Sequence, residues 1–309
     1  MIPRPGIETR RGGRFITVTL LSLFATRVLS LRATEESMGT WTLDTIAWDR
    51  FDGSKVDPEI LRNIKAAAMV ERNGSDYGVY LGRVFANDPV FVEDVKRWSG
   101  EEIQHGMALG RWAQMADPSW DFDAAFERFR KGYQLPLDAM ASVRGSQAGE
   151  MMARCIVETG TSSYYSALKD ATEEPVLKQI CGQIAADEFR HYKLFFDHMQ
   201  RCLERDRLSR LRRLWIGWGR VAESEDDELA YAYYAANEPL DAPYDRAKAQ
   251  RAYARRAYPL YRPFHVQRAM AMVLKAVGLK ANGRLHRVLW SLASKLMQAR
   301  AASLARAGA

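Results

Sequence analysis

Apolar residues recur along most of this chain at the three- and four-residue spacing of an amphipathic α-helix. No run alternates apolar and polar residues for long enough to predict a β-sheet. The spacing predicts four long helices, over residues 58–85, 89–115, 146–170 and 175–205. We therefore expect an all-α protein.

Three of the predicted helices begin at an acid followed by proline: Asp57-Pro58, Asp88-Pro89 and Glu174-Pro175. The acid accepts hydrogen bonds from free N–H groups of the first turn, and proline suits the first helical position because it has no N–H to leave unpaired. The connection between the second and third long helices is the longest, and it has room for a short helix over residues 122–133. This layout predicts a ferritin-like four-helix bundle with one crossover, over residues 38–205.

Residues 206–309 predict additional helices beyond the bundle. An Arg- and Trp-rich stretch and an acidic junction, residues 223–228, precede two predicted helices, over residues 244–277 and 283–306. Aromatic residues cluster in this part of the chain, namely Tyr231, Tyr233, Tyr234, Trp215 and Trp218. They fit either the lining of an acyl tunnel or plain packing between the bundle and the added helices.

Residues 1–37 stand apart from this pattern. Their mainly apolar run, Phe15–Ala25, is too short to span a bilayer, which needs about 20 residues. Arginines precede it as in a secretory signal, but others follow it closely and no clean cleavage site is visible. We expect either a targeting-like segment or an upstream extension, outside the fold.

Two helices carry the same pair of candidate metal ligands. The second long helix contains Glu102-Ile-Gln-His105, and the fourth contains Glu188-Phe-Arg-His191. Residues three apart point from one face of a helix, so each carboxylate accompanies its imidazole. A carboxylate-bridged di-iron site is built from two such pairs and one further glutamate from each of the other two helices.

The remaining two glutamates follow from position. Glu71 lies near the middle of the first helix, and the third helix offers Glu150 and Glu158. Glu150 is near the helix start, where an acid is expected for the helix dipole alone, so Glu158 is the better candidate. The separations are 31 residues from Glu71 to Glu102 and 30 from Glu158 to Glu188. Antiparallel neighbours would bring these acids to one level of the bundle.

Three stretches resemble the helix motifs of the soluble acyl-carrier-protein desaturases, within a similarity that covers about residues 60–205. The motif of that family's second bundle helix is similar to Trp98-Ser-Gly-Glu-Glu-x-x-His105-Gly. The motif of its fourth helix is similar to Gln179-Ile-Cys-Gly-Gln-Ile-Ala-Ala-Asp-Glu188-x-Arg-His191, and its Glu-x-x-Thr resembles Glu158-Thr-Gly-Thr161. Residues 206–309 do not share the resemblance.

The resemblance implies a dimeric di-iron enzyme that uses O₂ and two electrons from ferredoxin. Such an enzyme inserts a cis double bond into an acyl chain on acyl carrier protein. It implies six iron ligands: Glu71, Glu102, His105, Glu158, Glu188 and His191. Thr161 would lie beside the oxygen-binding face. Asp187 would accept a hydrogen bond that orients a ligand histidine, a contact that metal-bound imidazoles generally make.

The number and spacing of the cysteines limit which redox groups the chain itself can hold. The chain has three cysteines, and none forms a C-x-x-C pair. A disulfide framework is therefore not expected, and a reducing, cytoplasmic location is favoured. A built-in rubredoxin or ferredoxin module is excluded, since each needs clustered cysteines. We expect any electrons to come from another protein.

Charge is distributed unevenly along the chain. Residues 246–309 carry 14 Arg and Lys and no acid, residues 1–32 have a net charge of +5, and residues 33–245 have −12. A basic end can meet an acidic carrier protein or ferredoxin, an anionic membrane surface or nucleic acid, and it can also be a solvated helix face. No recognition motif supports nucleic acid, and we expect no such partner.

The sequence leaves three classes of function open. The first is a di-iron oxidoreductase acting on a fatty acyl chain or another apolar substrate. The second is a ferritin- or rubrerythrin-like protein for iron handling or peroxide removal, and the third is a helical scaffold without metal. The added helices favour the enzyme, because storage subunits consist of little more than the bundle.

Overall fold

A computed structural model describes residues 41–222 and 227–307, and every element in these ranges is helical. The predicted all-α class is confirmed. The chain divides after Thr42 into two units, and the unit Leu43–Ala309 contains all elements discussed below. None of its described helices is both long and apolar enough to cross a membrane. The segment 1–37 lies outside the described residues.

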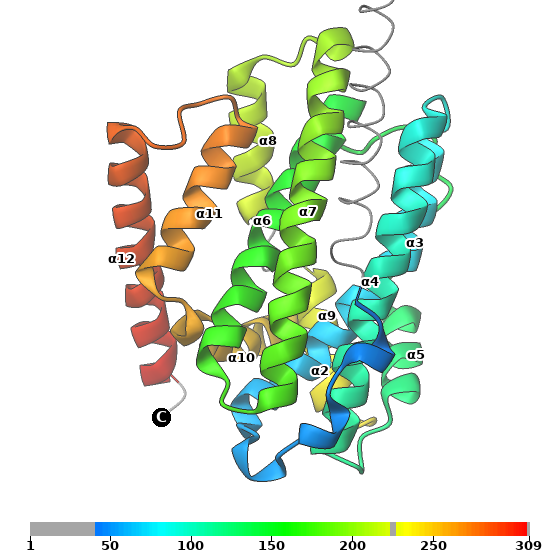
Figure 1. Ribbon diagram of the computed structural model, residues 1–309, viewed down its shortest axis with the longest axis vertical. Coiled ribbons are helices and arrows are strands. Elements are labelled where there is room, and N and C mark those ends of the chain that lie inside the picture. The colour runs from blue at the N-terminus through cyan, green and yellow to red at the C-terminus, as the bar shows by residue number, and fades with distance from the viewer. Residues whose placement is uncertain (1–40, 223–226, 308–309) are drawn as a thin grey trace, which may run out of the picture. The chain divides into compact units, whose positions relative to one another are not determined.

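The four-helix bundle consists of five helical segments: α2 (Pro58–Arg72), α3 (Gly74–Val84), α4 (Pro89–Ala116), α6 (Gln147–Ala171) and α7 (Pro175–Asp206) (Figure 1). The predicted starts are confirmed. The Asp88 carboxylate accepts from the Phe91 N–H, and the Glu174 carboxylate accepts from the N–H groups of Val176 and Leu177. Both caps satisfy backbone donors that a helix start leaves without partners.

Side-chain contacts fix the directions of the helices. α6 runs antiparallel to α7, because its start bonds Asp206 through the Ala148 N–H while its middle bonds Glu188 through the Thr161 hydroxyl. α2 and α3 run antiparallel both to α4 and to α6, so α4 and α6 are parallel. Parallel neighbours in the chain need a connection that returns along the bundle. Residues 117–146, with α5 (Phe122–Gly132), make that crossover.

The predicted helix over residues 58–85 is wrong in one respect: it is two helices, interrupted at Asn73. Asn73 has φ −72° and ψ −3°, and its amide donates to Glu228 at 3.1 Å. At the next residue, a Cβ on Gly74 would lie 2.3 Å from the Glu102 Cβ, so glycine permits α4 to approach. The interruption lies two residues after Glu71 and next to Gly74, which contacts Glu102. It is therefore located where the candidate ligands Glu71 and Glu102 come together.

The predicted helix over residues 244–277 is also wrong. The structure has α10 (Arg246–Ala257), a 3₁₀ turn and α11 (Pro263–Ala276). Pro259 and Pro263 cause the break, since proline removes a helical hydrogen bond and disfavours helical backbone at the residue before it. A further helix, α9 (Asp227–Asn237), was not predicted and starts within the predicted acidic junction. The last predicted helix is observed as α12 (Arg284–Ala307).

The added helices pack on the bundle and on one another. α8 (Arg210–Ala222) and α11 lie against α6, α9 lies against α2 and α5, and α12 lies against α10 and α11. In Figure 1, α11 and α12 stand beside the bundle at its left. One side of α6 therefore faces a second layer of helices rather than solvent.

A substitution at Gly106 of α4 would test how closely α2 packs on α4. A Cβ at Gly106 would lie 2.5 Å from the Arg72 amide nitrogen and 2.8 Å from the Ala68 carbonyl oxygen, and backbone atoms cannot move aside cheaply. We expect Gly106→Ala to lower the free energy of unfolding by about 1–3 kcal/mol, the usual effect of overpacking. The measurement is chemical denaturation.

Gly100, on the same helix, is the matched control. A Cβ there meets nothing within 4 Å, and alanine is the better helix former. Gly100→Ala should therefore be neutral or stabilise by up to about 1 kcal/mol. Equal stability of the two variants would contradict the described contact between α2 and α4.

Candidate metal centre

The six predicted ligand residues converge at the centre of the bundle. Their ligand atoms form two overlapping groups, Glu71–Glu102–His105–Glu188 and Glu102–Glu158–Glu188–His191. Within each group the atoms lie within 4.8 Å of one another, and all six residues are buried. Glu102 and Glu188 belong to both groups, whereas each remaining carboxylate and each imidazole belongs to one. Buried Glu and His side chains thus lie where they could hold metal ions.

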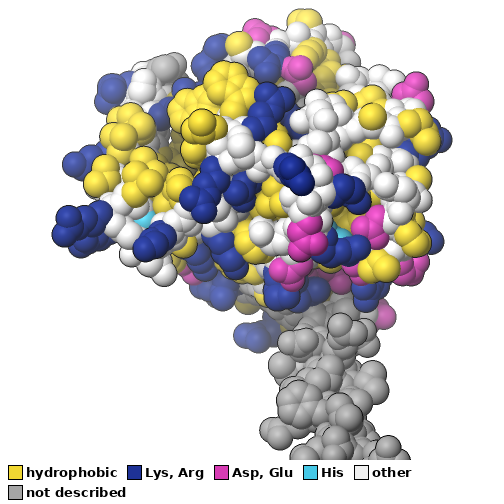
Figure 2. Space-filling view, turned by 90° about the horizontal axis from the view of Figure 1, so that it is seen from above, with side chains coloured by type: hydrophobic (Ala, Val, Ile, Leu, Met, Phe, Trp, Pro, Cys, Tyr) yellow, Lys and Arg dark blue, Asp and Glu magenta, His cyan; other side chains and the backbone are white. Residues whose placement is uncertain are grey.

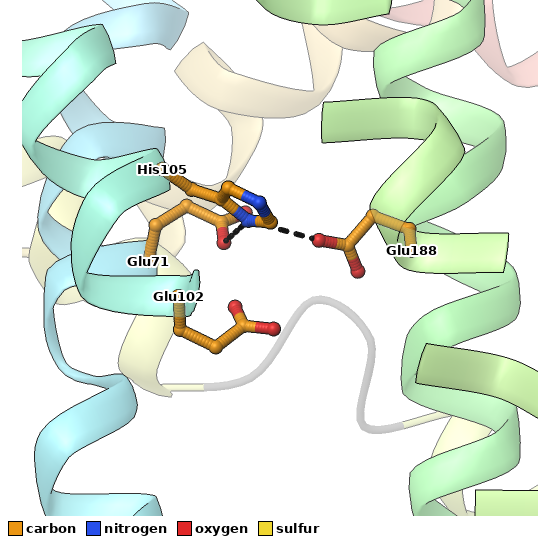
Figure 3. Close-up of side chains that lie close together, drawn as sticks. All are labelled: Glu71, Glu102, His105 and Glu188. Carbon is orange, nitrogen blue, oxygen red and sulfur yellow. Dashed lines mark ion pairs between the residues drawn. The ribbon is translucent and has the colours of Figure 1, made fainter. Parts of the chain in front are cut away.

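Figure 3 shows the first group. His105 Nδ1 faces inward, 3.6 Å from Glu71 Oε2 and 3.3 Å from Glu188 Oε1. α2 and α4 supply Glu71, Glu102 and His105 from one side, and Glu188 projects from α7 on the other side. Glu71 therefore points into the bundle, beside His105 and in one ligand group with Glu102.

The second group has the same arrangement around His191. Its Nδ1 lies 3.0 Å from Glu102 Oε1, and 3.8 Å from both Glu158 Oε2 and Glu188 Oε1. Glu158, from α6, is only 1% exposed. Glu150, the alternative on the same helix, instead accepts a hydrogen bond from the Tyr80 hydroxyl at 2.9 Å.

Each imidazole is oriented through its outer nitrogen. His105 Nε2 lies 2.9 Å from Asp187 Oδ2, and His191 Nε2 lies 2.7 Å from Glu101 Oε2. In both cases the acid that precedes a candidate ligand on one helix holds the histidine of the other helix. A carboxylate in this position fixes the ring and leaves the inner nitrogen for a metal.

Sequence reasoning named Asp187 for this contact and missed Glu101. The sequence contains a signal for the contact that Glu101 makes. Glu101 precedes Glu102 as Asp187 precedes Glu188, so the two helices repeat an acid–Glu–x–x–His pattern.

Several inward atoms lack hydrogen bonds. Among the described residues, Oε1 of Glu102, Glu158 and Glu188 and Nδ1 of His191 are buried without a hydrogen-bond partner of good geometry. Buried polar atoms normally have partners, so this convergence is unusual. A cation bound between them would satisfy all of these acceptors at once. The donor set, carboxylate oxygen and imidazole nitrogen, suits iron, zinc or manganese.

The charges of the centre are strongly coupled. Burial raises the pKa of Glu102 well above its usual range, and the Glu188 and Glu71 carboxylates add to the effect. Burial and the same kind of repulsion raise the pKa of Glu158. Burial alone would lower the pKa of His191, but its contacts with Glu101, Glu102 and Glu188 outweigh that effect and raise it. Without a metal, protons must supply the positive charge that these carboxylates need.

Two hydroxyl groups complete the surroundings of the ligands. Thr161, predicted to lie beside an oxygen-binding face, donates to Glu188 Oε2 at 2.5 Å. Tyr165, which sequence reasoning did not single out, donates to Glu71 Oε1 at 2.5 Å. Each hydroxyl holds one oxygen of a carboxylate and so restricts how the other oxygen points.

A cavity of about 860 Å³ adjoins the centre. Glu71, Glu102, Glu158 and Glu188 form part of its wall, and Thr161 also lines it. Most of the remaining wall is apolar or aromatic and comes from α6 and the added helices, including Tyr164, Tyr253, Tyr261, Val266, Met270 and Val273. The volume is within the range of sites that bind small organic molecules.

Only part of the predicted aromatic cluster lines the cavity. Among the described lining residues Trp218 is present, whereas Tyr231, Tyr233 and Tyr234 are not. Tyr231 instead packs on Tyr234 and Tyr244 with ring centroids 5.4 and 4.8 Å away. The tyrosines of α9 thus serve packing, and other tyrosines line the cavity.

A scan against models of protein families found no match, and a search of curated proteins found none either.

Metal stoichiometry tests the two overlapping groups. Because Glu102 and Glu188 belong to both groups, replacing either by Ala should abolish binding of both metal ions. Glu71 and Glu158 each belong to one group. Each Ala variant should therefore lose the ion of its own group, keep the ion of the other group, and contain about one ion per chain. Metal analysis of purified, folded protein measures the ratio.

Glu150→Ala is the control, because it removes a buried acid of α6 that lies outside both groups. Its metal content should equal that of the unchanged protein. Full occupancy in the Glu102 and Glu188 variants would contradict the assignment, and so would loss of metal from the control alone.

Proposed function

We propose that this protein is a di-iron, O₂-dependent oxidoreductase that acts on a long apolar chain. The observation that carries the proposal is the contact between the candidate metal centre and the apolar cavity. Glu102, Glu158 and Glu188 belong to both, so a chain lying in the cavity would reach the metals directly.

The residues fit a pair of iron ions. Glu71, Glu158, His105 and His191 would each hold one ion, and Glu102 and Glu188 would be shared. Bound iron would supply the activation of O₂ that oxidation of an unactivated C–H bond requires. Carboxylate-rich helical bundles with two Glu-x-x-His pairs hold such iron pairs.

The chain's own residues would orient the metal ligands and select the substrate. Asp187 and Glu101 hold the imidazoles, so the ligands are oriented before a substrate arrives. The apolar wall would exclude water and select a substrate without charge along its length. Thr161 lines the cavity and donates to Glu188, so its hydroxyl lies between ligand and substrate space.

The resemblance noted in the sequence favours desaturation of an acyl chain over other oxidations. Such a reaction removes two hydrogens from neighbouring carbons, forms a C=C bond and reduces O₂ to two waters with two further electrons and two protons. The sequence holds only three cysteines, and all three are buried and free, so an external, ferredoxin-like protein would supply the electrons. The same resemblance also implies that the protein is a homodimer and that acyl carrier protein delivers the chain.

Turnover under O₂ tests the function. Iron-loaded protein with a chemical or ferredoxin reductant should consume O₂ faster when fatty acyl substrates are added. Mass spectrometry then distinguishes the reactions: desaturation lowers the substrate mass by two hydrogens, and hydroxylation raises it by one oxygen. Accumulation of ferric iron or peroxide consumption, with no acyl oxidation, would contradict the proposal and favour an iron-handling or peroxide-removing protein.

Gly160 tests whether the cavity holds the substrate. It lines the cavity on α6, and a Cβ there meets nothing within 4 Å. We expect Gly160→Phe to fill cavity space and to lower turnover of long chains by about tenfold or more, since displaced apolar contacts are worth a few kcal/mol. Shorter chains should lose less, and Gly160→Ala should change little.

Gly82 provides the matched control, because a Cβ there also meets nothing within 4 Å but the residue does not line the cavity. Gly82→Phe should leave chain-length preference unchanged. If Gly160→Phe and Gly82→Phe behave alike while both retain iron, the cavity does not hold the substrate.

A further inference from the structure

Helix α8 carries an apolar face that the rest of the described chain leaves uncovered. Its buried side packs through Ile216 and Gly217, where a Cβ on Gly217 would lie 3.1 Å from the Met152 side chain. The opposite side presents five large apolar residues at helical spacing: Leu211, Leu214, Trp215, Trp218 and Val221. Leu211 is 79% exposed and Trp218 is 72% exposed. A soluble surface rarely shows so continuous an apolar face.

Helix α12 repeats the arrangement. Its inner side is buried at His286 and Ser294. Its outer side presents four residues that are each at least half exposed: Leu285, Val288, Leu292 and Leu296. Apolar residues on the outer side of a helix at intervals of three and four give it an amphipathic character that its packing on α11 does not use.

Both apolar faces are surrounded by positive charge. Residues 207–222 carry five arginines, residues 246–309 carry 14 Arg and Lys, and neither stretch has an acid. In Figure 2, hydrophobic side chains interleave with Lys and Arg on the left, the side on which α12 lies in Figure 1, while Asp and Glu gather toward the right. The charge complements an anionic partner.

Both helices contribute exposed residues to the rim of the cavity. Trp218 and Val221 of α8 and Arg300 of α12 line the cavity and are also exposed, so they mark its mouth. Met297 continues the lining on α12, next to the exposed Leu296. The exposed rim of the cavity therefore includes residues of both helices.

We propose that α8 and α12 form a docking surface for an anionic lipid membrane, which the protein binds from one side without crossing it. Interfacial helices combine an apolar face with Lys and Arg in this way, and tryptophan favours the headgroup level of a bilayer. A membrane that covers these faces also meets Trp218 and Val221, which are exposed and line the cavity, so an apolar chain would reach the cavity without entering water.

Two other occupants fit these observations less well. A second copy related by a two-fold axis would place this surface against itself, and Arg would face Arg with no acid in either stretch. An acidic carrier protein matches the charge, but it is a small folded surface and would leave part of the two apolar faces in water.

That the membrane supplies the substrate rests on the proposed oxidation of an apolar chain and takes the place of delivery on acyl carrier protein, whereas binding of the surface to lipid depends on neither. Vesicle binding therefore tests the surface without turnover. The full-length protein should float with phosphatidylcholine vesicles that contain phosphatidylglycerol and should remain unbound with phosphatidylcholine alone. Binding should weaken as salt rises from low to physiological levels, because exposed charges are then screened beyond about 8 Å.

Variants outside the cavity wall locate the contact. The double variants Leu211→Ala with Trp215→Ala, and Leu292→Ala with Leu296→Ala, should each weaken vesicle binding by about tenfold or more. Arg212→Glu should weaken it by about fivefold or more, the contribution of one basic side chain near an anionic surface. All variants should keep their helical content and metal content.

Leu240→Ala is the control, because Leu240 is 86% exposed and lies outside both helices. It should bind vesicles as the unchanged protein does. The proposal is overturned if no vesicle binds, if the control loses as much binding as the double variants, or if the double variants abolish self-association or acyl-carrier-protein binding while vesicle binding is absent. Vesicle binding without acyl oxidation would overturn the proposed function alone.

Discussion

The structure depends on holding four carboxylates together inside a helical bundle. Ionised carboxylates in a buried site repel one another and lose their hydration, which is costly unless positive charge is close by. Here two imidazoles lie among them. Burial opposes their effect, but their contacts hold the pKa of Glu188 well below its usual range, whereas burial and the neighbouring carboxylates raise the pKa of Glu102 and of Glu158. The arrangement is therefore compatible with a site that cations complete. A bundle selected only for stability would place apolar side chains at this level.

The packing of the helices follows from that constraint. Glu71 and Glu102 meet only if the first helix of the bundle comes very close to α4, and glycines allow it: Gly74 against Glu102, and Gly106 against the backbone of Arg72. Between these contacts the first helix is interrupted at Asn73, whose side chain bonds Glu228 of α9. The added helix thus fixes the bundle where the ligands converge, and the two layers form one structure rather than a bundle with appendages.

The sequence predicted what depends on local chemistry. Helix starts at Asp88 and Glu174 follow from capping. The six candidate ligands follow from two i, i+3 pairs and two further glutamates at matching separations of 31 and 30 residues. The sequence missed what depends on tertiary contact. The interruption at Asn73 is set by α4 and α9, and the cavity needs residues of α6, α10 and α11 to meet. The break near Pro259 was predictable, since proline ends helices wherever they pack.

The added helices also change what the centre can do. In a bare bundle the outer face of α6 would meet solvent, and Glu158 would have water close behind it. Here α8, α10, α11 and α12 enclose an apolar space against that face, and the candidate ligands form its inner wall. The apolar wall would limit water on the side where a substrate would lie, and polar interactions inside the site would become stronger in the lower dielectric. The same helices turn apolar and basic residues outward, so the layer that encloses the site also determines what the molecule meets at its mouth. Selectivity would then depend on the added layer, and reactivity on the bundle.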